Sequence, residues 1–285
     1  MFDSFTDQVV TTAETTIRVR VAGSGPPLLL LHGFPQTHLM WHRVAPGLAE
    51  HFTVVVTDLR GYGDSGKPPT TADHGPYSKR AMARDQVEVM QQLGFDRFRL
   101  AGHDRGARCA YRLALDHPDA VERLAVLDIV PTIDALERTD LEVANLWWRW
   151  FFLAQPAPLP ETLIAADPEA FYFGRHHELF SPQALAGYRA AVADPATIHA
   201  QCEDYRAMMT LDLDHDRADR GRCRITAPLL TLWGRRSPID RWFDVEAVWQ
   251  EWATDVRGHA IDCGHFLPEE APDRIVSEFL NFFRD

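Results

Sequence analysis

Short apolar runs alternate with amphipathic, helix-like stretches along most of the chain. Each run is a few residues long and is bounded by turn residues, which is typical of strands buried on both faces of a parallel sheet. We predict strands at about 28–31, 52–57, 98–101, 124–128, 228–233 and 258–262. Residues 15–21 alternate instead between polar and apolar side chains, which indicates an antiparallel hairpin at the sheet edge. The pattern therefore predicts an α/β fold with a doubly wound, mostly parallel sheet.

The alternation of strands and helices stops between Pro131 and about Arg220. Helix-like segments rich in Trp, Phe and Ala, separated by prolines, take its place. We therefore expect a helical cap at 131–220, inserted between two parts of one core at 1–130 and 221–285. The 285 residues, 46% of them hydrophobic, are enough to bury a full core, so one unit with an inserted cap fits better than two independent domains.

The segment Gly102-His103-Asp104-Arg105-Gly106 follows one predicted strand and precedes a helix-like stretch. This is the G-x-X-x-G pattern of a nucleophile elbow, a sharp turn that exposes its central side chain above the sheet edge. A carboxylate gains nothing by attacking an ester, because the product would be an anhydride. It can displace a leaving group from saturated carbon and form an alkyl ester. Asp104 is thus a candidate nucleophile, the alternative being a surface Asp in an ordinary glycine turn.

Hydrolysis of such an ester needs a general base and an acid that orients it. His265 lies in a loop after the last predicted strand, which is the position and chain order expected of the base. Asp128, at the end of the run 124–128, and Asp240, shortly after the run 228–233, both fit the order nucleophile, acid, histidine. We favour Asp128 because a strand end fixes its position, although either Asp could instead cap a helix.

The turn His32-Gly33-Phe34-Pro35 follows the first buried strand. There the backbone N–H of Phe34, together with that of Arg105, would form an oxyanion hole for the tetrahedral intermediate. The glycine-rich segment 58–66 contains G-x-G but has neither the phosphate-binding Lys-Ser or Lys-Thr nor dinucleotide spacing. The sequence has no clustered His/Cys pattern either, so we expect neither a cofactor nor a metal.

Taken together, segments 32–35, 58–65, 102–106 and 264–266 resemble the α/β-hydrolases of the dehalogenase and epoxide-hydrolase branch, over nearly the whole chain. Many members of that branch have Trp directly after the nucleophile. Arg105 with Arg108 resembles the fluoroacetate (haloacetate) dehalogenases instead, as do segments 127–132, 152–156 and 202–206. The resemblance implies that both arginines hold a substrate carboxylate and that Asp128 is the acid. It also implies that Trp150 and Tyr205 donate to the departing halide, and that the protein is a homodimer.

One position departs from that family, because Trp148-Arg149-Trp150 places Arg149 where the family has His. Arginine keeps hydrogen-bond donors and adds charge, but it is longer and planar. Arg149 is therefore either a third halide ligand in a reshaped pocket or a surface side chain that turns to a carboxylate such as Glu142 or Glu161. In the first case we expect activity on chloro- or bromoacetate and weak release of fluoride.

The net charge of −12 and a pI near 5.5 argue against nucleic acid and anionic membranes as partners. The apolar stretch 147–153 is far shorter than the roughly twenty residues that cross a membrane. The four cysteines have no C-x-x-C spacing and the chain start does not resemble a signal peptide, so we expect a reduced, cytoplasmic protein.

These features favour a cofactor-independent hydrolase that converts short 2-haloacids to 2-hydroxyacids. The alternatives are an epoxide hydrolase acting on a carboxylated epoxide and, from a different class, a non-catalytic carboxylate-binding protein.

Overall fold

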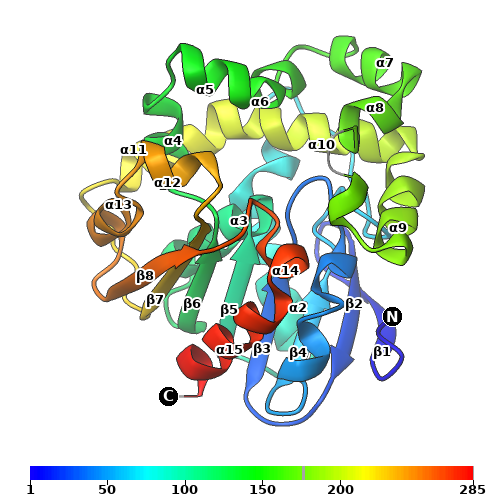
Figure 1. Ribbon diagram of the computed structural model, residues 1–285. Coiled ribbons are helices and arrows are strands. Elements are labelled where there is room, and N and C mark those ends of the chain that lie inside the picture. Colours follow the sequence, from blue (N-terminus) through cyan, green and yellow to red (C-terminus); the bar gives the residue numbers. More distant parts are fainter. Residues whose placement is uncertain (175–176, 285) are drawn as a thin grey trace.

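The computed structural model describes residues 1–174 and 177–284 and contains one eight-stranded sheet (Figure 1). The strands are β1 (Thr6–Thr11), β2 (Thr16–Ala22), β3 (Pro27–Leu31), β4 (Thr53–Thr57), β5 (Phe98–His103), β6 (Val121–Leu127), β7 (Leu229–Gly234) and β8 (Val256–Ile261). Their order across the sheet is β1-β2-β4-β3-β5-β6-β7-β8. The hairpin β1–β2 and the pair β2–β4 are antiparallel, and all other neighbours are parallel. The predicted mostly parallel, doubly wound sheet with an antiparallel edge hairpin is confirmed.

Helices cover both faces of the sheet. On one face α2 (Lys79–Gln92) and α3 (Arg105–Asp116) lie side by side, and on the other α1 (Ala45–Leu48) packs against α15 (Pro272–Phe283) (Figure 1). The central strands are fully buried between these layers, as Leu28–Leu31 and Val54–Val56 show. Burial on both faces explains why these strands are continuous apolar runs. Shorter elements complete the core: η1 (His38–Trp41), η2 (Gly75–Tyr77), α12 (Pro238–Trp242), α13 (Val245–Trp252) and α14 (Leu267–Glu270).

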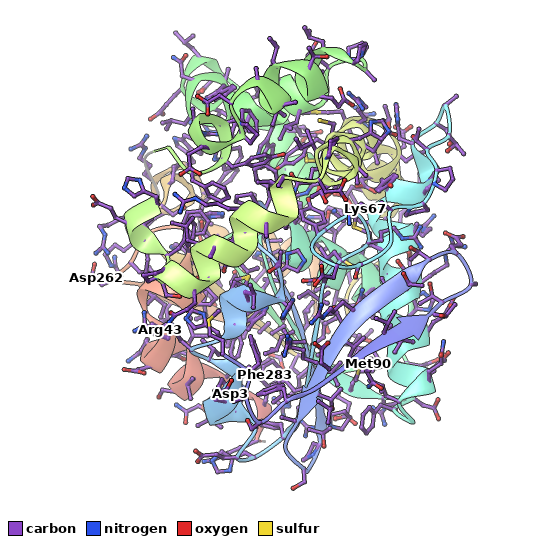
Figure 2. The ribbon with its side chains drawn as sticks, turned by 90° about the vertical axis from the view of Figure 1, so that its right-hand side faces the viewer. Asp3, Arg43, Lys67, Met90, Asp262 and Phe283 are labelled. Carbon is purple, nitrogen blue, oxygen red and sulfur yellow. The ribbon has the colours of Figure 1, made fainter. Side chains whose placement is uncertain are left out.

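Between β6 and β7 the described chain forms only helices, which we call the cap. They are α4 (Thr132–Glu137), α5 (Leu141–Leu146), α6 (Trp148–Leu153), α7 (Leu159–Ala166), α8 (Pro168–Tyr172), η3 (His177–Leu179), α9 (Pro182–Val192), α10 (Pro195–Ala207), the π-helical turn η4 (Met208–Asp212) and α11 (Leu213–Asp219). The cap lies over one end of the sheet, where the parallel strands have their carboxyl ends (Figure 1). Figure 2 shows α9 lying across η1, and Lys67 beneath the cap, where its ammonium lies 3.9 Å from Asp194.

This arrangement brings distant parts of the sequence to one place. In a parallel sheet the carboxyl ends of neighbouring strands meet at the same edge, and loops from that edge carry the functional side chains. Asp104 follows β5, Asp128 follows β6 and His265 follows β8. No helix in the described part of the chain is long and apolar enough to cross a membrane.

Candidate active site

Asp104 occupies the sharp turn between β5 and α3. Its backbone has φ +47° and ψ −115°, a conformation that costs an L-residue about 1–3 kcal/mol and persists only where the surroundings enforce it. Neighbouring backbone atoms pack tightly against this turn. A Cβ on Gly102 would lie 2.6 Å from the backbone of Gly106, and a Cβ on Gly106 would lie 2.4 Å from the carbonyl oxygen of His32. Only glycine fits at either position, so the two glycines hold the turn in its strained shape.

The carboxylate of Asp104 is buried but surrounded by positive groups. The N–H of Phe34 donates to its Oδ2 at 2.9 Å. Burial acts to raise the pKa of Asp104, but the charges of His265 and Arg105, together with the Phe34 N–H, outweigh it and lower the pKa. The carboxylate is therefore ionised at neutral pH, as a nucleophile must be. Arg105 is the first residue of α3, so its N–H has no acceptor in a preceding turn of that helix.

His265 forms a hydrogen bond with Asp128, not with Asp240. Its Nδ1–H donates to Asp128 Oδ2 at 2.6 Å, and Asp128 is fixed in turn by the N–H of Gly234 at 2.8 Å and the hydroxyl of Ser237 at 2.7 Å. Asp240 instead accepts a hydrogen bond from the indole N–H of Trp233 at 2.6 Å. Of the two acids that the sequence offered, the structure therefore brings only Asp128 to the histidine.

The imidazole of His265 has one nitrogen free. Burial acts to lower its pKa, but the hydrogen bond and charge of Asp128, with the charge of Asp104, outweigh it and raise the pKa. Its side chain is 35% exposed, and its Nε2 bonds to none of the residues 1–174 and 177–284. His103 packs against it, with ring centroids 4.6 Å apart, and donates through Nε2 to the His265 carbonyl at 2.7 Å. Burial lowers the pKa of His103 to about 4, so this neighbour is neutral and acts as a support.

A cavity of about 310 Å³ lies between these residues and the cap. The core contributes Asp104, Asp128, His265 and Arg108 to its lining, and the cap contributes Arg149 and the aromatic side chains Trp147, Trp150, Tyr172 and Tyr205. An apolar wall with a few polar groups is typical of a small-molecule site.

The two arginines after the nucleophile differ in their surroundings. Arg108 lines the cavity with its guanidinium over the ring of Trp150 at 4.8 Å. It donates to the hydroxyl of Thr132 at 3.0 Å and to the carbonyl of Val130 at 3.3 Å, and it binds no carboxylate in the described chain. Burial lowers the pKa of Arg108. A buried cation with only neutral partners is a site at which an anion can bind.

Arg105 is fully buried and is not among the residues that line the cavity. Its Nε donates to Asp204 Oδ2 at 3.0 Å, one terminal nitrogen contacts both Oδ1 and the carbonyl of the same residue, and the other lies 2.8 Å from the sulfur of Met208. Lys79 binds Asp204 as well. The guanidinium lies over the ring of Tyr205, 4.3 Å from its centroid. The family resemblance implies the same carboxylate-binding role for Arg105 and Arg108, but in the structure Asp204 neutralises Arg105.

The predicted halide ligands all line the cavity. The Tyr205 hydroxyl and the Trp150 indole N–H donate to no residue in the described ranges, so both donors are free. Burial raises the pKa of Tyr205, which keeps its hydroxyl protonated. Arg149 donates to the carbonyl of Phe171 through Nε at 3.2 Å and through one terminal nitrogen at 3.0 Å.

The expectation that Arg149 turns away to a carboxylate is wrong for both candidates. Glu142 binds Arg241, and Glu161 binds Arg206. The stacking of the Arg149 guanidinium over Trp148 at 4.8 Å keeps it beside the cavity.

Sequence reasoning missed two residues that position this site. Ser237 holds Asp128, and Asp204 holds Arg105, across 109 and 99 residues of sequence. A serine before proline and an acid within a helix carry no local signal of such partners. Among the described residues, no three His, Cys, Asp or Glu side chains are grouped as a metal site would require.

Comparisons with known proteins agree with this geometry. The sequence profile of the alpha/beta hydrolase fold matches residues 26–272. The chain is 48% identical to a fluoroacetate dehalogenase from Burkholderia sp., over 99% of this chain and 95% of the relative. It is 36% identical to a soluble epoxide hydrolase from Corynebacterium sp. (strain C12), over 92% and 91%.

Two solved structures are similar over nearly the whole chain. One, from Nostoc sp. PCC 7120 and provisionally described as an alpha/beta hydrolase, has a TM-score of 0.97 and 53% identity, with 99% of both chains covered. The other is a mutant from Pseudomonas aeruginosa with bound MFA, provisionally described as an epoxide hydrolase. It has a TM-score of 0.92 and 50% identity, with 99% of this chain and 96% of that chain covered.

Proposed function

The chain belongs to the alpha/beta hydrolase fold family, and we propose that within it the protein converts short 2-haloacids, such as haloacetate, to 2-hydroxyacids. The observation that carries the proposal is an ionised carboxylate, Asp104, at the nucleophile elbow of a cavity that also contains the unpaired guanidinium of Arg108. An Asp nucleophile is suited to displacement at saturated carbon, and the guanidinium of Arg108 favours a substrate that carries a carboxylate. The similarity to a fluoroacetate dehalogenase supports the same reaction.

In the first step Arg108 binds the substrate carboxylate while an oxygen of Asp104 attacks the α-carbon. A carbon–oxygen bond forms, the carbon–halogen bond breaks, and the halide leaves with the bonding electron pair. The free donors of Trp150 and Tyr205 stabilise the charge that develops on the halide. Arg105 adds positive charge beside the nucleophile and lowers its pKa, although its donors are largely occupied by Asp204.

In the second step His265 removes a proton from water through its free Nε2, and the water attacks the carbonyl carbon of the Asp104 ester. Asp128 holds the imidazole through Nδ1 and stabilises its charged form. The N–H groups of Phe34 and Arg105 stabilise the tetrahedral oxyanion. The intermediate collapses by breaking the acyl C–O bond, and the departing oxygen takes the proton of the hydroxyl that came from water. This releases the 2-hydroxyacid and restores the Asp104 carboxylate, and the proton on His265 passes to solvent.

A carboxylated epoxide is the second candidate substrate. The similarity to the Corynebacterium epoxide hydrolase favours it, as does the free hydroxyl of Tyr205, which could protonate the opening ring. Of the two tyrosines that line the cavity, Tyr172 is occupied, because it donates to Gln201 at 2.7 Å. Formation of a diol from the epoxide, as opposed to release of halide from a haloacid, distinguishes the two reactions.

The proposal also covers the oligomeric state and the cellular location of the protein. We infer a homodimer from the family resemblance, and a reduced, cytoplasmic setting from the spacing of the four cysteines, which contains no C-x-x-C. Light scattering of the purified protein tests the first inference.

Trapping of the ester tests the mechanism. His265→Asn protein, incubated with chloro-, bromo- or fluoroacetate, should gain about 58 Da, and peptide mapping should place the adduct on Asp104, because the ester forms but is not hydrolysed. The matched variant Asp104→Asn should gain no mass. Halide release and product identity should be measured for the wild type with the same acids and with glycidate. Turnover by His265→Asn without an adduct would contradict the mechanism, and diol formation without halide release would favour the epoxide.

A further inference from the structure

We propose that Arg149 binds a second anionic group, so that the preferred substrates include 2-haloacids with a second carboxylate, such as 2-chlorosuccinate. This inference rests on the proposed function, because it extends the substrate class of the same cavity.

The first support is the pairing of arginines in this acidic protein. Five arginines are buried in the described chain, and four of them bind a carboxylate: Arg60, Arg105, Arg112 and Arg206. The fifth, Arg108, binds none and lines the cavity. The partly buried Arg149 lines the same cavity and likewise binds no carboxylate in the described ranges. Two cations without carboxylate partners therefore face one space.

The second support is that Arg149 is held in place by neutral groups. Its Nε and one terminal nitrogen donate to the carbonyl of Phe171, and its guanidinium lies over Trp148 at 4.8 Å and Phe171 at 5.5 Å. A carbonyl fixes the direction of the guanidinium but does not cancel its charge. Burial lowers the pKa of Arg149, as it does for a cation that has lost water without gaining a carboxylate. The second terminal nitrogen bonds to no described residue.

The third support is the room available. A haloacetate has few atoms, whereas cavities of about 300–1,000 Å³ hold much larger ligands. The cavity here measures about 310 Å³, with Arg108 contributed by the core helix α3 and Arg149 by the cap helix α6. An acid that carries one carboxylate for each guanidinium would use both cations and more of the space.

The sequence raised Arg149 as a third halide ligand. Trp150 and Tyr205 already offer free neutral donors to a halide. A full charge on a planar, two-pronged donor is better matched to a carboxylate. The chemistry is unchanged: an oxygen of Asp104 attacks C2 of 2-chlorosuccinate, the C–Cl bond breaks with both electrons leaving on chloride, and water hydrolyses the ester to 2-hydroxysuccinate.

The experiment compares two substrates of equal chain length, 2-chlorosuccinate and 2-chlorobutanoate, which differ by a carboxylate in place of a methyl group. For the wild type, kcat/KM should be at least about tenfold higher for the diacid. Arg149→Met, which keeps length and removes charge, should lower this ratio at least about tenfold, mainly through KM, and Arg149→Lys should lower it less. Arg138→Met, which removes a partly exposed cap arginine that is paired with Asp140 and does not line the cavity, should leave the ratio unchanged.

Inhibition of the wild type by succinate and by butanoate gives a second measurement that needs no variant to fold. Succinate should compete more strongly. A wild type that prefers the monoacid, or a ratio that stays within about threefold in Arg149→Met, would overturn the inference while activity on chloroacetate leaves the proposed function intact. Absence of turnover of every haloacid would overturn both.

Discussion

Replacement of Asp204 by Asn should destabilise the protein strongly, because this one buried carboxylate neutralises two cations. Arg105 and Lys79 both bind it, and their side chains are 0% and 3% exposed. The amide keeps the shape and one acceptor but loses the charge. Removal of one partner from a buried ion pair costs about 3–5 kcal/mol. Since both cations share one anion, their losses do not add, and we expect about 3–5 kcal/mol in total.

This loss converts to a melting temperature and a pH dependence. At about 2–4 °C per kcal/mol for a chain of this size, Tm should fall by about 6–20 °C. Burial, with the charge of Arg105, lowers the pKa of Lys79, and Asp204 opposes that shift. Without Asp204 the lysine should lose its proton more easily. A lysine whose pKa is lower in the folded than in the unfolded state destabilises the fold at low pH, and this cost is relieved as the pH rises toward the unfolded pKa. The Tm deficit should therefore shrink as the pH is raised through the alkaline range.

Thermal unfolding followed by circular dichroism measures both effects. The matched control is Asp214→Asn, which makes the same change in an exposed pair with Arg217, where the side chains are 68% and 59% exposed. Exposed pairs contribute about 0–1 kcal/mol, so this variant should melt close to the wild type. A Tm for Asp204→Asn within about 3 °C of the control, or a deficit that grows with pH, would refute the reasoning.

Three further predictions concern other charged groups. Arg108→Lys should lower kcat/KM for haloacids at least about tenfold, because lysine cannot make a planar double contact, whereas Arg105→Lys should lower Tm more and KM less. Asp128→Asn should lower kcat by about 10²-fold or more, whereas Asp240→Asn should leave kcat within about threefold, because Asp128 and not Asp240 binds His265. Equal losses of kcat in steady-state assays of the two variants would contradict this assignment. Burial raises the pKa of Glu269 to about 7 from an ordinary 4.5, despite hydrogen bonds from Tyr188 and Gln36, so its contribution to stability is present below pH 4.5 and is lost as pH rises through 7. Glu269→Gln should therefore gain stability relative to the wild type across that interval, by at most about 3.4 kcal/mol. A difference in Tm between the two proteins that stays constant from pH 4 to about 8 would exclude this role.

The central strands could be predicted because burial on both faces leaves a continuous apolar run. Their ends could not be placed as well, because a strand can continue through residues that are not apolar. β6 begins at Val121, three residues before the predicted run at 124. The prediction started too late because Glu122 and Arg123, which are only partly buried, interrupt the apolar pattern. β5 likewise continues through Gly102 and His103, which are buried but not apolar. Polarity, not strand geometry, set the predicted boundaries.

The meeting of Asp104, Asp128 and His265 could be predicted from chain order, since parallel strands end at one edge of the sheet. The partners of charged side chains could not. Arg105 and Arg108 are three residues apart on one helix, so the sequence treats them alike. The difference between them is decided by Asp204, a residue of the cap that folding brings against only one of the two.

The charge of the preferred ligand depends on which cavity arginines lack a carboxylate partner, and not on the net charge of the protein. A total of −12 would seem to repel an acid, but surface charges are screened within about 8–10 Å at physiological salt. Cations inside a partly closed cavity are screened much less. What an entering acid meets is therefore the guanidinium groups that the fold leaves without carboxylates. Asp204 removes Arg105 from that set, while Arg108 and Arg149 keep neutral hydrogen-bond partners, so an acidic protein can offer two guanidinium groups to an acid in a cavity that also contains the Asp104 carboxylate.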